Sequence, residues 1–183
     1  MDIKKILTVI DGISHAVILL RDTNPEACVS DIEYSRALNV EGIVRIIDCL
    51  KERKIKPVFA STEVVYDGER GNYTEEDTPN PILEYGRQKL AVEKYMIENL
   101  REYLILRFAL VLSDKKEIRS PLSKWIEDIN NNKPLRLAHD YIASPVYVVD
   151  AAEAVKKLIS VGVYGIFNIA GSEALSRLEI GKL

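Results

Sequence analysis

Three side chains in the middle of the chain have the chemical types that the reduction of a carbonyl group needs. Thr62 follows a short apolar run, and Tyr85 and Lys89 stand four residues apart. Residues i and i+4 of a helix share a face, so the Lys89 ammonium would favour the phenolate of Tyr85 and lower its pKa. Such a phenol can give its proton to a carbonyl oxygen as hydride reaches the carbon, while the Thr62 hydroxyl hydrogen-bonds the same oxygen.

The Tyr-x-x-x-Lys pair is weak evidence by itself. The chain has 9 tyrosines, so about one such pair is expected by chance, and most pairs of this kind lie on solvated helix faces. The hydroxyl residue at the end of the preceding strand is what turns Tyr85 and Lys89 into a candidate site. A solvated, structural role stays open at this stage.

The elements that would position these residues alternate along the chain. Short apolar runs predict strands, and apolar residues at helical spacing predict helices. We expect strands over 15–20, 57–61, 103–112, 134–138 and 165–171, and helices over 39–54, 83–100, 120–132 and 148–160. Strands separated by helices of this length predict an α/β fold with a doubly wound parallel sheet. In such sheets ligands bind beyond the carboxyl ends of the strands, where Thr62 is expected.

Composition narrows the class of protein further. A length of 183 residues suggests one domain with a small appendage, and a net charge of −3 gives no reason to expect nucleic acid or an anionic membrane as partner. No apolar run approaches the roughly 18 residues of a membrane span. The two cysteines, Cys28 and Cys49, form no metal-binding motif. We expect a cytoplasmic protein without a metal site.

Four segments together resemble one family. They are "STEVVYDG", "YTEEDTPNPILEYGRQKLAVEK", "SPVYVVDAAEAV" and "GIFNIAGSEALSR". In this order and spacing they resemble the extended short-chain dehydrogenase/reductases, and most closely the dTDP-4-dehydrorhamnose reductases. The resemblance implies a Rossmann-type sheet, NADP or NAD as cofactor and a nucleotide-sugar substrate.

The resemblance also implies roles for single residues. Thr62 matches the catalytic hydroxyl, Tyr85 the acid, and Lys89 the residue that tunes this acid and holds the nicotinamide ribose. Tyr85 and Lys89 would thus also bind the cofactor. Asn39 matches an asparagine near the cofactor, although a helix N-cap or a structural polar residue is an equal alternative.

The residues expected to contact the substrate match the family less closely. Glu63 stands where the family has a substrate-contacting aspartate, and Tyr73 lies in the loop that covers the substrate cleft in the family. Both are expected to contact the substrate. Leu110 replaces a tryptophan, which removes a flat contact surface.

The cofactor end departs further from the family. The Gly-rich turn G-x-x-G-x-x-G, whose amides hold the pyrophosphate, does not occur, and Arg21 and Asp22 replace two small alanines. We therefore expect a Rossmann-type domain that is incomplete at its N-terminus. Its NAD(P)H binding should be weak, and it should associate with other copies through residues 3–20. Arg21 is the first candidate for another phosphate contact.

The sequence thus predicts a partial Rossmann-type domain over 1–112 that carries the catalytic residues. A substrate-binding lobe follows over 113–183, with helix 148–160 returning to the sheet. The expected function is NAD(P)H-dependent reduction of a nucleotide-linked 4-keto sugar by a homo-oligomeric reductase or epimerase-like protein. A non-catalytic subunit stays open, because the regulatory subunit of methionine adenosyltransferase resembles the same family. An inactive fragment is the third alternative.

Overall fold

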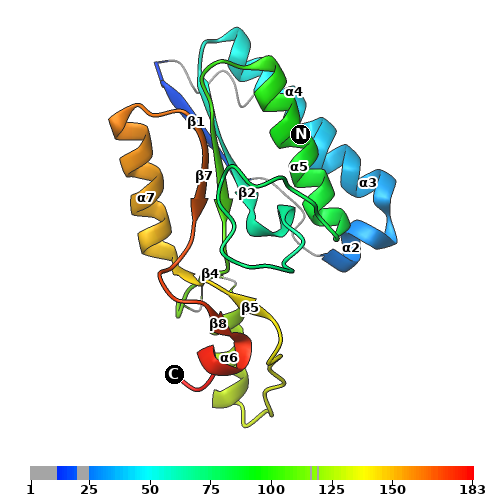
Figure 1. Ribbon diagram of the computed structural model, residues 1–183, viewed down its shortest axis with the longest axis vertical. Coiled ribbons are helices and arrows are strands. Elements are labelled where there is room, and N and C mark those ends of the chain that lie inside the picture. Colours follow the sequence, from blue (N-terminus) through cyan, green and yellow to red (C-terminus); the bar gives the residue numbers. More distant parts are fainter. Residues whose placement is uncertain (1–11, 20–24, 116, 119) are drawn as a thin grey trace. The chain divides into compact units, whose positions relative to one another are not determined.

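The computed structural model describes residues 12–19, 25–115, 117–118 and 120–183 (Figure 1). The described residues form two compact units. The first runs to Arg107 and includes Val163–Phe167, and the second comprises Phe108–Gly162 and Asn168–Leu183. The predicted functional division at residue 112 stays a proposal. The two units reflect packing, and packing alone does not show which residues bind a substrate.

A four-stranded parallel sheet organises the first unit. Its strands, in spatial order, are β1 (His15–Ile18), β2 (Lys56–Thr62), β3 (Leu104–Phe108) and β7 (Gly165–Ile169). In the β1–β2 pair, His15 lies opposite Lys56 and Ile18 opposite Phe59. All residues of β2 from Pro57 onward are buried, as expected of a strand with both faces covered. The predicted parallel α/β fold is confirmed.

Helices and short turns complete the first unit. They are α2 (Pro25–Ser30), α3 (Ile32–Arg36), the π turn η1 (Ala37–Glu41), α4 (Gly42–Glu52), the 3₁₀ turn η2 (Glu63–Val65) and α5 (Glu84–Asn99). Helices α4 and α5 contact each other and both contact β2 (Figure 1). The apolar stripe of α4 joins β2 and α5 in one core cluster that includes Ile47, Phe59 and Met96. This core fixes the inner face of α5 against β2.

The second unit contains short elements and two longer helices. They are β4 (Val111–Leu112), α6 (Pro121–Asn130), β5 (Ile142–Ala143), β6 (Val146–Tyr147), α7 (Val148–Val161), β8 (Leu175–Ser176) and α8 (Arg177–Ile180). Strands β4 and β6 pair in parallel, whereas β5 and β8 pair antiparallel. Helix α6 begins at a capping box in which Ser120 and Ser123 bond each other's backbone amides. In the parts of the chain that the structure describes, no helix is long and apolar enough to cross a membrane.

Two strand predictions are wrong. The run 103–112 does not form one strand, because its hydrogen-bond partners change after Phe108. The Ala109 amide donates to the Ile169 carbonyl at 2.9 Å, and the Leu110 carbonyl accepts from the Val146 amide at 3.0 Å. The run 134–138 is irregular. Pro134 has no N–H to donate to a ladder, and the nearby strand pairing instead forms between β5 and β8.

Candidate active site

The inner face of helix α5 carries a stripe of three polar residues at i, i+4 and i+8. Tyr85, Lys89 and Glu93 are all buried, with 7%, 2% and 0% of their surfaces exposed. Each of the last two contacts the end of β2. The Lys89 Nζ donates to the Ala60 carbonyl at 2.7 Å, and the Ser61 hydroxyl donates to the Glu93 carboxylate. The stripe is therefore not a solvated helix face, which was the structural alternative for the Tyr–Lys pair.

The Lys89 ammonium lies near two aromatic rings. Its Nζ is 4.4 Å from the centroid of the Phe59 ring and 5.9 Å from the centroid of the Tyr85 ring. A cation at such distances is attracted to the ring faces. The lysine is thus held next to the phenol that it was predicted to tune.

Thr62 ends β2 and caps the 3₁₀ turn η2. Its side-chain oxygen accepts a hydrogen bond from the Val64 amide at 3.3 Å, and the residue is 7% exposed. Among the described residues, no acceptor receives the hydrogen of this hydroxyl. The hydroxyl can therefore donate to a ligand while the turn holds its oxygen in place.

Gly86 explains how the first turn of α5 comes so close to η2. A Cβ atom at this position would lie 2.4 Å from the Val64 carbonyl oxygen and 2.9 Å from the Pro81 Cβ. Glycine in a helix costs about 0.5–1 kcal/mol relative to alanine, and here it permits the contact that brings Tyr85 toward the turn capped by Thr62.

Asn39 lies in the π turn η1 and is 3% exposed. Its Nδ2 donates to the Gln88 Oε1 at 2.9 Å, and the Gln88 Nε2 donates to the Ser35 hydroxyl at 2.9 Å. The N-cap alternative is wrong, since Arg36 and Glu41 occupy the N-cap positions. Asn39 instead ties η1 to α5 beside Lys89, and its contact with a cofactor stays a prediction.

The two predicted substrate residues lie after β2. Glu63 is the first residue of η2 and is partly exposed. Tyr73 lies in the loop 67–80, with its ring stacked on that of Tyr66 at a centroid distance of 4.5 Å. Its hydroxyl donates to Asp67. Contact of either residue with a substrate stays a prediction.

The structure contains a buried ion pair that was not predicted from the sequence. The Arg107 Nη2 lies 2.7 Å from the Glu93 Oε2, and the Nη1 donates to the Tyr66 hydroxyl at 2.7 Å. Burial by itself would lower the pKa of Arg107, but the hydrogen bonds and charges of Glu93 and Tyr66 together outweigh it, so this pKa is raised. The pair could have been predicted from Arg107, a charged residue inside the apolar run "YLILRFALVL". A buried charge requires a partner.

The site residues fit one end of a dinucleotide better than the other. Contact of Tyr85 and Lys89 with a nicotinamide ribose stays a prediction, and the structure places both residues on one buried face of α5. A glycine-rich cradle for the pyrophosphate is absent from this sequence, whose first 60 residues contain only Gly12 and Gly42. Arg21, the alternative phosphate contact, lies outside the described residues.

Comparisons with known proteins agree with the predicted resemblance. The chain is 28% identical over 164 residues to the probable low-salt glycan biosynthesis reductase Agl14 of Haloferax volcanii, covering 87% of this chain and 55% of that protein. It is 28% identical over 130 residues to methionine adenosyltransferase 2 subunit beta of Rattus norvegicus, covering 67% of this chain and 39% of that protein. The chain thus spans about half the length of these curated relatives.

A solved structure agrees with the fold. The dTDP-4-dehydrorhamnose reductase of Bacillus anthracis in complex with NADP superposes with a TM-score of 0.90 at 23% identity, covering 99% of this chain and 65% of that chain. This likeness confirms the Rossmann-type α/β fold. The family model of the RmlD substrate binding domain matches residues 4–183. Because this match includes nearly the whole sequence, the chain belongs to the RmlD substrate binding domain family.

Proposed function

We propose that the chain carries the catalytic part of an NADPH- or NADH-dependent reductase that acts on a nucleotide-linked 4-keto sugar. The observation that carries the proposal is the buried stripe of Tyr85 and Lys89 against the end of β2, the strand that ends with the capping hydroxyl of Thr62. The family match and the reductase Agl14 support it. Glu63 and Tyr73 are the proposed substrate contacts.

Each residue of the site has a separate task in this reaction. A reduced nicotinamide, when bound, supplies the hydride to the carbonyl carbon. Tyr85 gives its phenolic proton to the carbonyl oxygen, and Lys89 stabilises the phenolate that remains. The Thr62 hydroxyl donates a hydrogen bond to the same oxygen and holds it in line with the proton.

The proposed cofactor contacts are limited to the ribose end. Tyr85 and Lys89 would hold the nicotinamide ribose, with Asn39 nearby, whereas no residue pattern in this sequence suits the pyrophosphate. The 183-residue chain alone should therefore bind NADPH or NADH weakly. Calorimetric titration tests this expectation, and micromolar affinity would contradict it.

The proposed chemistry is tested with the chain joined to, or mixed with, a segment that restores cofactor binding. Reduction of a panel of 4-keto nucleotide sugars is measured for this protein and its Tyr85→Phe variant. Loss of the proton donor should slow the chemical step by about 10²–10⁴. Tyr95→Phe is the matched control, because Tyr95 lies on the same helix and bonds Asp48 outside the site. Equal activity of wild type and Tyr85→Phe would reject the proposal.

A second candidate function is that of a binding subunit for another enzyme. The similarity to methionine adenosyltransferase 2 subunit beta over 67% of this chain favours it. In that case the restored protein would bind nucleotide without reducing any sugar of the panel. Tyr85→Phe would then leave the affinity for a partner enzyme unchanged.

A further inference from the structure

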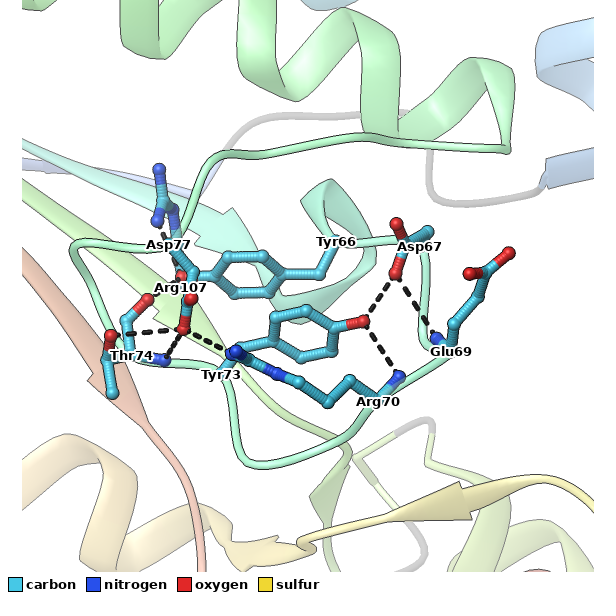
Figure 2. Close-up of polar contacts among 8 residues, drawn as sticks. All are labelled: Tyr66, Asp67, Glu69, Arg70, Tyr73, Thr74, Asp77 and Arg107. Carbon is cyan, nitrogen blue, oxygen red and sulfur yellow. Dashed lines mark hydrogen bonds and ion pairs between the residues drawn. The ribbon is translucent and has the colours of Figure 1, made fainter.

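Four side chains form a column of two stacked tyrosine rings, each with a guanidinium group near it. We call Arg107, Tyr66, Tyr73 and Arg70 the Arg–Tyr column. The two rings are 4.5 Å apart and inclined by 10°, and each guanidinium carbon lies 5.1 Å from the centroid of its neighbouring ring. Figure 2 shows Tyr66 above the Tyr73 ring and the Arg70 side chain below it. Ring stacking and cation–π attraction both operate at such distances.

The column is anchored at its buried end. Arg107 is 3% exposed, and its Nε and Nη2 bond the carboxylate of Glu93 at 2.7–3.2 Å. Its remaining Nη1 donates to the Tyr66 hydroxyl. Because the guanidinium is planar and its donors point in fixed directions, this anchor sets the position of Tyr66.

Arg70 and Tyr73 belong to the loop 67–80 themselves, and three hydrogen bonds of the column tie further loop residues to it. The Tyr66 hydroxyl donates to the Thr74 carbonyl at 2.8 Å. The Tyr73 hydroxyl donates to Asp67, and Arg70 bonds Asp77 at 2.7 Å (Figure 2). These bonds hold Asp67, Thr74 and Asp77, near the beginning, middle and end of the loop.

Both ends of this segment adjoin the proposed catalytic residues. Tyr66 follows η2, the turn that Thr62 caps, and Pro81 packs against Gly86 next to Tyr85. The anchor Glu93 belongs to the same stripe of α5 as Tyr85 and also accepts the hydroxyl of Ser61. We therefore expect a substitution in the column to alter the conformation of the loop beside the site and to leave the catalytic side chains themselves unchanged.

We infer that Arg107 and Tyr66 are positioning residues, which together with the stacked ring of Tyr73 hold the loop 67–80 in one conformation beside the site and so raise the affinity for the nucleotide sugar. The part of this inference that concerns affinity rests on the proposed function. The part that concerns the loop rests only on the hydrogen bonds and ring contacts of the column.

Amide hydrogen exchange of the 183-residue chain tests the loop directly. The reporters are the amides of Glu69, Thr74 and Asp77, each of which bonds an acceptor within the loop that no variant removes. Tyr66→Phe removes the hydroxyl link but keeps the ring, and Tyr73→Leu removes the ring. Both tyrosine variants keep the Glu93–Arg107 pair. They therefore test whether the column orders the loop even if a third variant, Arg107→Lys, fails to fold.

We expect the column variants to speed exchange of the reporter amides by about 3- to 10-fold, the effect of one hydrogen bond, while the amides of β2 keep their wild-type rates. Glu76→Gln is the control, because Glu76 is an exposed loop residue outside the column. Wild-type exchange in the loop of both Tyr66→Phe and Tyr73→Leu would overturn the inference. An equal rise in the loop and in β2 would overturn it too, since the effect would then be global.

Steady-state kinetics of the restored protein with dTDP-4-dehydrorhamnose distinguish a positioning role of the column from the catalytic role of Tyr85. Tyr66→Phe and Arg107→Lys, which change no proposed substrate contact, should raise KM without a matching fall in kcat, whereas Tyr85→Phe should lower kcat. An equal fall of kcat in these two column variants would overturn their positioning role. If the wild-type protein does not reduce the sugar, the proposed function and the affinity part of the inference fail together. The exchange rates still decide whether the column orders the loop.

Discussion

Glu93 illustrates how one buried carboxylate organises the residues around it. It is fully buried and accepts hydrogen bonds from Ser61 at the end of β2 and from Arg107 on β3. A buried charge is tolerated only when it is paired and hydrogen-bonded. The same residue therefore fixes the helix that carries Tyr85 and the strand that ends at Thr62.

We predict that Glu93→Gln strongly destabilises the protein. The amide removes the charge that compensates Arg107, and breaking one side of a buried pair costs about 3–5 kcal/mol. The free energy of unfolding in urea measures the cost. Glu98→Gln on the exposed face of the same helix is the control and should change it by no more than about 0.5 kcal/mol. A cost below about 1 kcal/mol for Glu93→Gln would contradict the assigned role of the pair.

At the scale of elements, the approach of α5 to η2 decides whether the site forms. This approach depends on Gly86, whose missing side chain leaves room for the Val64 carbonyl. We predict that Gly86→Ala costs about 1–3 kcal/mol of stability, the usual cost of overpacking, despite the better helix propensity of alanine.

Thermal unfolding of Gly86→Ala measures this cost. The matched control is Gly42→Ala, where an added Cβ would lie 3.3 Å from the Ala37 carbonyl oxygen and the backbone is helical, with φ −62°. The control should remain within about 1 kcal/mol of wild type. Equal stability of both variants would mean that α5 can move away from η2 without cost.

The loop 67–80 should open in acid. Hydrogen bonds from the Tyr73 hydroxyl, Asn80 and the Glu69 amide lower the pKa of Asp67, and the Thr74 amide, its hydroxyl and Arg70 lower the pKa of Asp77. Groups with a lowered pKa in the ordered loop contribute stability above their ordinary pKa near 3.8. This contribution is lost as the pH falls below that value through the lowered pKa values.

Near-UV circular dichroism of the stacked tyrosines between pH 6 and pH 2 would follow the opening of the loop. This range extends roughly two pH units to either side of an ordinary Asp pKa. Far-UV spectra taken in parallel report unfolding of the whole chain. Asp67→Asn lacks one of the two carboxylates and should show a smaller acid transition. A tyrosine signal that changes only together with the far-UV signal would speak against separate opening of the loop.

At the scale of the whole molecule, β1 is the edge strand of the described sheet. Val17 in this strand and Leu19 just after it expose 46% and 66% of their surfaces. An edge strand with exposed apolar side chains favours pairing with another chain. Part of the predicted interface over 3–20, namely residues 3–11 and 20, lies outside the described residues.

We therefore predict that the chain self-associates and that Leu19→Lys shifts it toward the monomer. Light scattering over a range of protein concentrations measures the mass. Val161→Lys, which alters a similarly exposed valine at the end of α7 (59% exposed), should leave the mass unchanged. A monomeric wild type at all concentrations would refute the predicted association.

The sequence by itself determined the alternation of strands and helices and the face shared by Tyr85 and Lys89. Both follow from local periodicity, since spacing along the chain sets the direction of each side chain in a helix or strand. The family resemblance likewise rested on the order of short motifs, and the family match confirmed it.

Only the tertiary structure decided that the stripe of α5 is buried, that Gly86 is a contact point and that Arg107 pairs with Glu93. It also decided that the run after Tyr103 divides into β3 and β4. These features depend on which segment lies opposite, and a partner distant in sequence leaves no periodic signal in the local pattern. Local spacing thus identified the reactive groups, and long-range packing determined their burial, their partners and the loop beside them.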